Sequence, residues 1–254
     1  MPIPYLSIII PNYNEMANLQ SGALDKVIKY LKKAKFTWEV IISDDNSTDG
    51  SREFIEKYIH KQAGFTLLHN SHTGKAGALK NGIARAKGKY ILFADMDQST
   101  PLSEVEKLLP WFSQGFNVVI GSRGQQRNSS LFRQIVSRVF FTFRRSVLLS
   151  DIVDTQCGFK AFETKTLKNT FPKLSNFDKQ GSVKGWVVSA FDVELLFMLC
   201  KKGENIKEVN VNWKDEDTST SKPRNFAKES IDMVRQLMRV KLRDIQGEYE
   251  NTTN

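Results

Sequence analysis

Short apolar runs alternate with helical patterns along the first 120 residues of this chain, and this alternation restricts the fold more than any other feature. The apolar runs cover residues 5–10, 38–43, 65–68, 90–94 and 117–120. Helical patterns fill the intervals, the longest of them at residues 16–34. Such alternation favours a doubly wound parallel sheet with helices on both faces. We therefore predict one α/β domain over residues 1–245, with a mostly parallel sheet, and a frayed tail at 246–254.

Composition narrows the class of partner. The formal net charge of +9 favours polyanions, such as nucleic acid, an anionic membrane or a phosphorylated ligand, without choosing among them. Two cysteines are too few for a disulfide framework, which favours a reducing, cytoplasmic compartment. The first ten residues lack the pattern of a signal peptide, and no apolar window reaches the roughly 18 residues that a membrane-spanning helix needs.

Acidic and polar residues follow three of the predicted strands. The first strand leads into Pro11-Asn12-Tyr13-Asn14-Glu15, the second into Asp44-Asp45-Asn46, and the fourth into Asp95-Met96-Asp97-Gln98. Ligands of an open parallel sheet bind beyond the carboxyl ends of its strands, so these residues converge where a ligand should lie. Carboxylates in an Asp-x-Asp pair suit Mg²⁺ or Mn²⁺, which usually complete their coordination shell with water and substrate phosphates.

Other nucleotide-binding motifs are absent from the sequence. The segment around Lys75 lacks the upstream glycine and the Ser/Thr of a P-loop, and no Gly-x-Gly-x-x-Gly follows the first strand. Lys75 still lies at the start of a predicted helix, where a phosphate can bind. His60, His69 and His72 have no supporting constellation, and we interpret them as surface or loop residues.

Taken in order and spacing, segments 11–15, 44–51 and 95–97 resemble family 2 glycosyltransferases of the GT-A fold. Segments 154–160 and 191–196 resemble the polyprenyl-phosphate branch of that family. The resemblance implies an inverting transfer of a hexose from a nucleotide-diphosphate sugar to a polyprenyl phosphate, with UDP-glucose favoured over GDP-mannose as the donor. Many members of the branch carry transmembrane helices, and this sequence shows no such segment.

The resemblance also implies roles for individual residues. It places Pro11, Tyr13, Glu15 and Asp44 around the base and ribose, with Lys75 and Met96 as further nucleotide contacts. It places Asp95 and Asp97 on the metal and diphosphate, with Gln98 beside them and Asp97 counted as catalytic. A phosphate acceptor is already largely ionised at neutral pH and needs little general-base help. A hydroxyl acceptor needs a base, for which Asp192 and Glu194 are the candidates.

A basic amphipathic helix is predicted at residues 130–149. No Asp or Glu occurs from Leu108 to Ser150, and seven apolar residues from Phe132 to Val147 recur at helical spacing. Such a helix can lie in an anionic membrane interface, which favours a peripheral protein at the cytosolic membrane face. The candidate cations for the acceptor phosphate are Arg123, Arg127, Arg133, Arg138 and Lys222.

Three alternatives remain open at this stage. A soluble family 2 glycosyltransferase with a saccharide hydroxyl acceptor would keep the donor site and need Asp192 or Glu194. A nucleic-acid-binding module would use the basic surface, but no recognised motif supports it, and we expect no nucleic-acid partner. A degenerate, inactive member is disfavoured by the intact Asp95 and Asp97.

Overall fold

The computed structural model describes residues 3–124, 152–177, 191–218 and 226–250, the side chains of Asn176 and of residues 226–233 excepted. Seven strands form one sheet in the order β3-β2-β1-β4-β6-β5-β7. The strands are β1 (Leu6–Asn12), β2 (Trp38–Asp44), β3 (Phe65–His69), β4 (Tyr90–Phe93), β5 (Val118–Ser122), β6 (Lys160–Glu163) and β7 (Ile206–Asn210). Every pairing is parallel except those of β6, which runs antiparallel to both β4 and β5.

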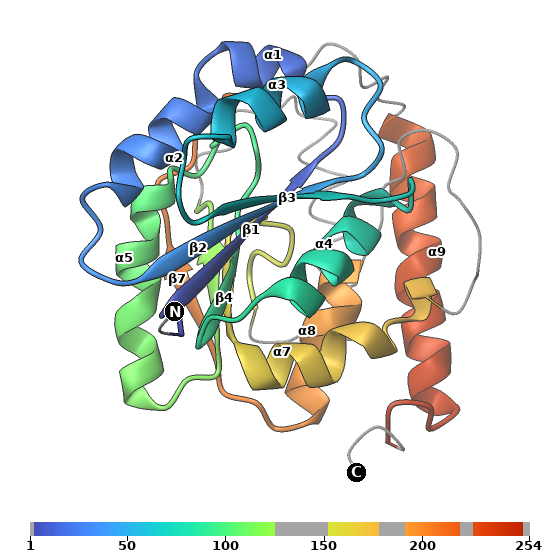
Figure 1. Ribbon diagram of the computed structural model, residues 1–254. Coiled ribbons are helices and arrows are strands. Elements are labelled where there is room, and N and C mark those ends of the chain that lie inside the picture. Colours follow the sequence, from blue (N-terminus) through green and yellow to red (C-terminus); the bar gives the residue numbers. More distant parts are fainter. Residues whose placement is uncertain (1–2, 125–151, 178–190, 219–225, 251–254) are drawn as a thin grey trace.

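Helices cover both faces of this sheet (Figure 1). One face carries α1 (Met16–Gln20), α2 (Ala23–Leu31), α3 (Ser51–Ile59) and α5 (Val105–Leu108). The other carries α4 (Gly74–Arg85), α7 (Thr164–Thr170), α8 (Phe191–Lys201) and α9 (Phe226–Ile245). Short 3₁₀ turns cover 102–104, 109–114, 171–173 and 175–177.

Strand β1 lies near the middle of the sheet and supplies both halves of the core. Leu6, Ile8 and Ile10 face the α2 side, whereas Ile9 faces α4, as the two-residue period of a strand requires. All four side chains are fully buried. A strand that is apolar on both faces reads as a continuous hydrophobic run, which explains why this strand was recognisable in the sequence.

The predicted α/β architecture, with its mostly parallel sheet and helices on both faces, is confirmed, and the structure adds two local corrections. The helix expected over residues 16–34 is two helices, because the chain turns at Gly22, whose φ of 85° lies in the left-handed region. Tyr249 lies in the segment predicted to fray, yet its side chain is 3% exposed and packs against Phe197 of α8.

The basic helix predicted at 130–149 lies outside the described residues. No helix in the described part of the chain is long and apolar enough to cross a bilayer.

Candidate active site

The carboxyl ends of β1, β2 and β4 meet at one edge of the sheet, as their parallel pairing requires. Each is followed by a non-glycine residue in the left-handed region: Asn14 (φ 54°), Asn46 (φ 65°) and Gln98 (φ 55°). They are the only such residues in the described part of the chain. Backbone strain of this kind costs on the order of 1–3 kcal/mol and gathers at functional sites. The edge is therefore the first place to look for a ligand.

The turn after β4 carries the predicted metal pair. Burial, and then repulsion by Asp95, raise the pKa of Asp97 to about 6, although the Ser99 amide donates to its Oδ1 at 2.8 Å. Two carboxylates that repel each other favour a cation between or beside them. Met96 separates them in sequence, but its side chain is 2% exposed and lies in the core, so only its backbone borders the site.

Lys75 reaches the same turn from the first turn of α4. Its Nζ lies 2.6 Å from Asp95 Oδ1. Burial opposes its charge, but Asp95, Asp192 and Asp97 outweigh this effect and raise the pKa of the Lys75 ammonium. Lys75 thus stands as a fixed cation beside the acidic pair, where it can bind a phosphate oxygen.

Gly158 leaves the space that Asp95 occupies. A Cβ at Gly158 would lie 2.0 Å from Asp95 Oδ2, far inside van der Waals contact. The backbone before β6 therefore packs directly against the carboxylate and fixes its position. This contact joins the first half of the chain to the antiparallel strand of the second half.

The carboxylate of Asp44, at the end of β2, accepts its hydrogen bonds from other residues of the protein. Asn12 Nδ2 donates to its Oδ1 at 2.7 Å, Ser47 Oγ to the same atom at 2.5 Å, and Arg52 Nε to its Oδ2 at 2.8 Å. Burial alone would raise the pKa of Asp44, but these donors outweigh burial and lower it. Asp44 therefore orders the strand end, and the ribose contact implied by the resemblance would need one of these bonds to open.

Asp45 organises the neighbouring loop. Its carboxylate accepts bonds from the amides of Thr73 and Gly74, each at 2.8 Å, at the start of α4. It therefore satisfies backbone donors that the first turn of a helix leaves unpaired. The His72 ring lies 2.8 Å from Asp45 through Nδ1 and stacks on Tyr13, with ring centroids 4.4 Å apart and planes inclined by 17°.

His72 is thus a loop residue, as predicted, but it is not a surface residue, since its side chain is only 14% exposed. The stacked pair of Tyr13 and His72 brings the β1 and β3 ends together and forms an aromatic element next to Pro11. Asp45 holds the His72 ring, and the Tyr13 ring stacks on it, as a binding platform for a planar base requires.

Segment 215–218 closes against α1 beside Glu15. Asn18 Nδ2 donates to Glu15 Oε2 at 2.5 Å and to Asp217 Oδ1 at 3.0 Å, and Asn18 Oδ1 accepts the Thr218 amide at 2.9 Å. Asp217 also contributes to the raised pKa of Asp97, after burial and Asp95. The segment therefore forms a border of the site. Lys222, which comes after this segment in the sequence, lies outside the described residues.

The two candidate bases on α8 separate. Asp192 forms an ion pair with Lys160, whose Nζ lies 2.6 Å from Asp192 Oδ1. Asp192 also contributes to the raised pKa of Lys75, which places it at the site. Glu194 is buried elsewhere and accepts bonds from the Ser175 amide (3.0 Å), Ser175 Oγ (2.7 Å) and Tyr249 Oη (2.8 Å). Residues two apart on a helix point to different sides, so the two carboxylates do not share one ligand.

Arg123 forms an ion pair with Asp154. Its Nε and Nη2 bind Asp154 at 2.7 and 2.8 Å in a bidentate pair, and its guanidinium lies 5.7 Å from the Trp213 ring centroid. Burial opposes the charge, but Asp154 outweighs it and raises the pKa of Arg123. Arg127, Arg133 and Arg138 lie outside the described residues.

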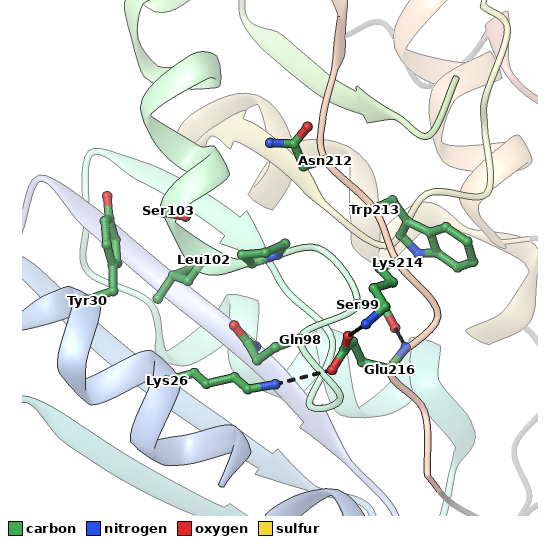
Figure 2. A pocket seen from close by; sticks show the side chains of 11 residues that line it. Lys26, Tyr30, Gln98, Ser99, Leu102, Ser103, Asn212, Trp213, Lys214 and Glu216 are labelled. Carbon is green, nitrogen blue, oxygen red and sulfur yellow. Dashed lines mark hydrogen bonds and ion pairs between the residues drawn. The ribbon is translucent and has the colours of Figure 1, made fainter. Parts of the chain in front are cut away.

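Gln98 supports the acidic turn from a cavity of about 350 Å³ (Figure 2). Its side chain is 3% exposed, its Nε2 donates to the Asp95 carbonyl at 2.7 Å, and its Oε1 has no hydrogen-bond partner. The metal contact predicted for Gln98 would require this amide to turn. The cavity is lined by Lys26, Tyr30, Gln98, Ser99, Pro101, Leu102, Ser103, Asn212, Trp213, Lys214 and Glu216.

The residues present fit a divalent cation that arrives with its substrate. Within the described ranges no group of three or more His, Cys, Asp or Glu side chains is placed to hold a metal ion. Mg²⁺ and Mn²⁺ are commonly held by one or two carboxylates together with substrate phosphates and water. Asp95 and Asp97 supply those two carboxylates, and a cation there would relieve the repulsion that raises the pKa of Asp97.

This fold places an acidic turn and a stacked aromatic pair at the carboxyl edge of a mostly parallel α/β sheet, the edge at which such folds bind their ligands. The chain belongs to glycosyl transferase family 2, whose model matches residues 7–171. It is a glycosyltransferase that uses a nucleotide-sugar donor. The match covers all three acidic strand ends and the whole of β6.

Individual relatives extend this similarity across nearly the whole chain. The chain is 36% identical to a dolichyl-phosphate beta-glucosyltransferase of Dictyostelium discoideum, covering 96% of this chain and 76% of that protein. It is 32% identical to the Homo sapiens protein of the same name, with coverage of 98% and 78%.

Among solved structures, glucosyl-3-phosphoglycerate synthase from Mycobacterium tuberculosis, in complex with Mn²⁺, UDP and glucosyl-3-phosphoglycerate, superposes with a TM-score of 0.63. The two chains are 17% identical, and the alignment covers 94% of this chain and 80% of that one. This likeness confirms the GT-A fold.

Four residues of the site carry no role in the sequence interpretation: Asp45, His72, Lys160 and Gly158. Asp45 had a usable signal, since a second carboxylate at a strand end points into the same edge. Lys160 and Gly158 lie in a segment that resembles the family, but their contacts with Asp192 and Asp95 depend on where β6 inserts. His72 depends on its stacking against Tyr13, which no local pattern indicates.

Proposed function

We propose that this enzyme transfers glucose from UDP-glucose to a polyprenyl phosphate of the dolichyl phosphate class, at the cytosolic face of a membrane. The observation that carries the proposal is the near full-length similarity to dolichyl-phosphate beta-glucosyltransferases, together with the site of Asp95, Asp97 and Lys75. The human and Dictyostelium relatives bear the same name although they are distinct proteins, which favours one shared substrate class.

Asp95 and Asp97 would hold Mg²⁺ or Mn²⁺ together with the diphosphate of the donor. When bound, the cation neutralises charge on the leaving nucleotide diphosphate. Lys75 adds a second positive charge to the same leaving group from the start of α4. The stacked Tyr13 and His72 rings support the base, and the loop ordered by Asp45 keeps Lys75 in reach of Asp95.

The contacts of Asp192 bear on the acceptor chemistry. Lys160 is fully buried and pairs with Asp192 at 2.6 Å, so this carboxylate is held in position by an ion pair with the fold. Such a group is suited to orienting a sugar hydroxyl or a lysine. A phosphate acceptor, ionised at neutral pH, needs no proton removed before its oxygen attacks the anomeric carbon. We assign Asp192 to orientation and not to general-base catalysis.

A transfer assay tests the proposal directly. Radiolabelled UDP-glucose, Mn²⁺ and polyprenyl phosphate in detergent micelles should give label in an organic extract, and EDTA should abolish it. Asp192→Asn should retain partial activity, with Glu194→Gln as the matched carboxylate control that affects folding and not the site. Label found only with GDP-mannose, or only on a soluble saccharide, would replace the donor or the acceptor named here.

Complete loss with Asp192→Asn in a folded protein would favour the soluble alternative, in which a hydroxyl acceptor needs a base. Calorimetry with UDP and with GDP, each with Mn²⁺, separates the donor from the acceptor. Binding of UDP without any transfer to polyprenyl phosphate would retain the glucosyl donor and reject the lipid acceptor.

A further inference from the structure

Helix α9 presents two apolar faces. Leu237 and Val240 are buried in the core cluster that also contains α8. The neighbouring arc of the helix carries an outer stripe of Val234, Met238, Leu242 and Ile245. At about 100° per residue, spacings of four, four and three keep these side chains on one side of the helix. Figure 1 shows α9 along the outside of the molecule.

The outer stripe is where exposed apolar surface concentrates. Its members are 39%, 52%, 57% and 72% exposed, in chain order. In the described part of the chain only two other large apolar side chains are comparably exposed, Ile3 and Val153. Scattered single residues of this kind need no explanation, whereas a contiguous exposed stripe marks an interaction surface.

The charges beside the stripe are basic. Residues 234–245 contain Arg235, Arg239 and Lys241, together with Arg243, which pairs with Glu248, and one acid, Asp244; the other acids of α9, Glu229 and Asp232, precede the stripe in the sequence. Asp244 is bonded to Lys201 and Lys241, which leaves little negative charge toward solvent. Arg235 and Arg239 are exposed and follow the stripe on one side, and Lys241 borders it on the other.

We propose that the outer stripe of α9 docks the enzyme on an anionic lipid bilayer. A helix with an apolar face and flanking arginines or lysines lies in the interface plane, with its apolar side chains among the acyl chains and its cations at the headgroups. A second copy of the chain fits this surface less well, because a two-fold interface would set the same cations opposite each other. The inference deepens the proposed function, since it rests on a lipid-linked acceptor.

Docking through α9 would hold the site near the bilayer. Helix α9 packs against α8, whose first turn carries Asp192 at the site. A protein without a spanning helix in its described part would then still meet a lipid acceptor in two dimensions.

Vesicle co-sedimentation without any donor or acceptor tests the docking by itself. Wild-type protein should sediment with vesicles of phosphatidylcholine and phosphatidylserine, and Met238→Asp/Leu242→Asp should lower its partition coefficient at least about tenfold. Ile3→Asp/Val153→Asp is the matched control, because it places the same two charges on exposed apolar residues outside α9. Circular dichroism should show that both variants keep the wild-type fold.

A second variant tests the charges. Arg235→Gln/Arg239→Gln should weaken binding to the anionic vesicles by about thirtyfold, from the usual contribution of two basic residues, and leave binding to pure phosphatidylcholine unchanged. Equal partitioning of wild type and both variants would overturn the proposal. So would a dimer in gel filtration that Met238→Asp/Leu242→Asp dissociates while vesicle binding is unaffected.

Activity separates this proposal from the proposed function. The stripe variant should transfer glucose normally to a short, water-soluble prenyl phosphate and poorly to polyprenyl phosphate in vesicles. Vesicle binding that depends on the stripe, without transfer to any prenyl phosphate, would retain the docking surface and reject the lipid acceptor. If wild type and variant transferred glucose equally to both acceptors, the lipid acceptor would be retained and the docking surface rejected.

Discussion

Two acidic strand ends lie at the same edge of the sheet, and the pKa values of their carboxylates are shifted in opposite directions. After β2, Asp44 is fully buried, yet donors from Asn12, Ser47 and Arg52 hold its pKa below the usual range. After β4, burial and the neighbouring Asp95 raise the pKa of Asp97 to about 6. The donors around Asp44 compensate the burial of its charge, whereas the surroundings of Asp97 do not.

The difference separates a structural carboxylate from a functional one. A group that the fold compensates completely has nothing to gain from a ligand, whereas an under-compensated pair gains stability when a cation or a cationic ligand arrives. Composition does not distinguish them, because both turns are Asp-rich and both follow buried strands. What distinguishes them is the number of donors that the surrounding elements supply.

The largest expected effect is on catalysis. Asp97→Asn should lower transfer by about a thousandfold or more, since the cation it helps to hold contributes several kcal/mol to leaving-group stabilisation. The free energy of unfolding without metal should stay the same or rise, because the repulsion with Asp95 is removed. Urea unfolding and the label-transfer assay measure the two quantities on one preparation. Activity above about a tenth of wild type would contradict the metal role.

The reverse pattern is expected at the other turn. Asp44→Ala should lower the free energy of unfolding by about 3 kcal/mol, because it leaves Arg52 and the donors of Asn12 and Ser47 without their acceptor. Asp49→Ala, on the same loop but exposed, is the control and should cost less. If Asp44→Ala abolished UDP binding at full stability, Asp44 would be a ligand contact and the contrast between the turns would fail.

Gly158→Ala tests how firmly the fold places Asp95. The added methyl would meet Asp95 Oδ2 at 2.0 Å and push the carboxylate away from Lys75. We expect transfer to fall by about ten- to a hundredfold, as for misplacement of a catalytic group by roughly 1 Å. The cost in stability should shrink when Asp95→Ala is combined with it, since the clash then has no partner. Additive effects in this double-mutant cycle would show that the methyl acts elsewhere.

The smallest effect is graded with pH. Mn²⁺ binding needs Asp97 ionised, so affinity should fall by up to tenfold per unit once the pH drops below about 6. Stability moves oppositely at the two turns. Ionised Asp97 lowers the free energy of unfolding above about pH 6, and this penalty is relieved as the pH falls toward the pKa that Asp97 has in the unfolded chain.

The contribution of Asp44 is present above its unfolded pKa and is lost as pH falls through its lowered folded value. Calorimetric Mn²⁺ titrations between pH 5 and pH 7.5, on the order of half a unit apart, measure the first effect. Mn²⁺ affinity that is unchanged across this range would remove Asp97 from the set of ligands.

The positions of β1, β2 and β4 were predictable because each is a local apolar run whose end is marked by polar residues. The helix over 16–34 was predicted too long, although Gly22 carries a local signal for the break. The pairing of Asp192 with Glu194 as alternative bases was also avoidable, since positions two apart on a helix face different sides. These are limits of interpretation and not of the sequence.

Other features are not local. Strand β6 inserts antiparallel between β4 and β5, and this brings Gly158 against Asp95 and Lys160 against Asp192. His72 joins the site only because Tyr13 approaches from another strand. None of these contacts has a periodicity, because each joins residues more than 25 positions apart.

The sequence by itself determined the alternation of strands and helices and the acidic residues that follow the strands at one edge of the sheet, since backbone preference and side-chain period act over a few residues. Only the tertiary structure decided which acid is compensated and which is available. Compensation depends on donors brought from distant segments, Asn12 to Asp44 and Lys160 to Asp192, and on the burial that strengthens each electrostatic interaction.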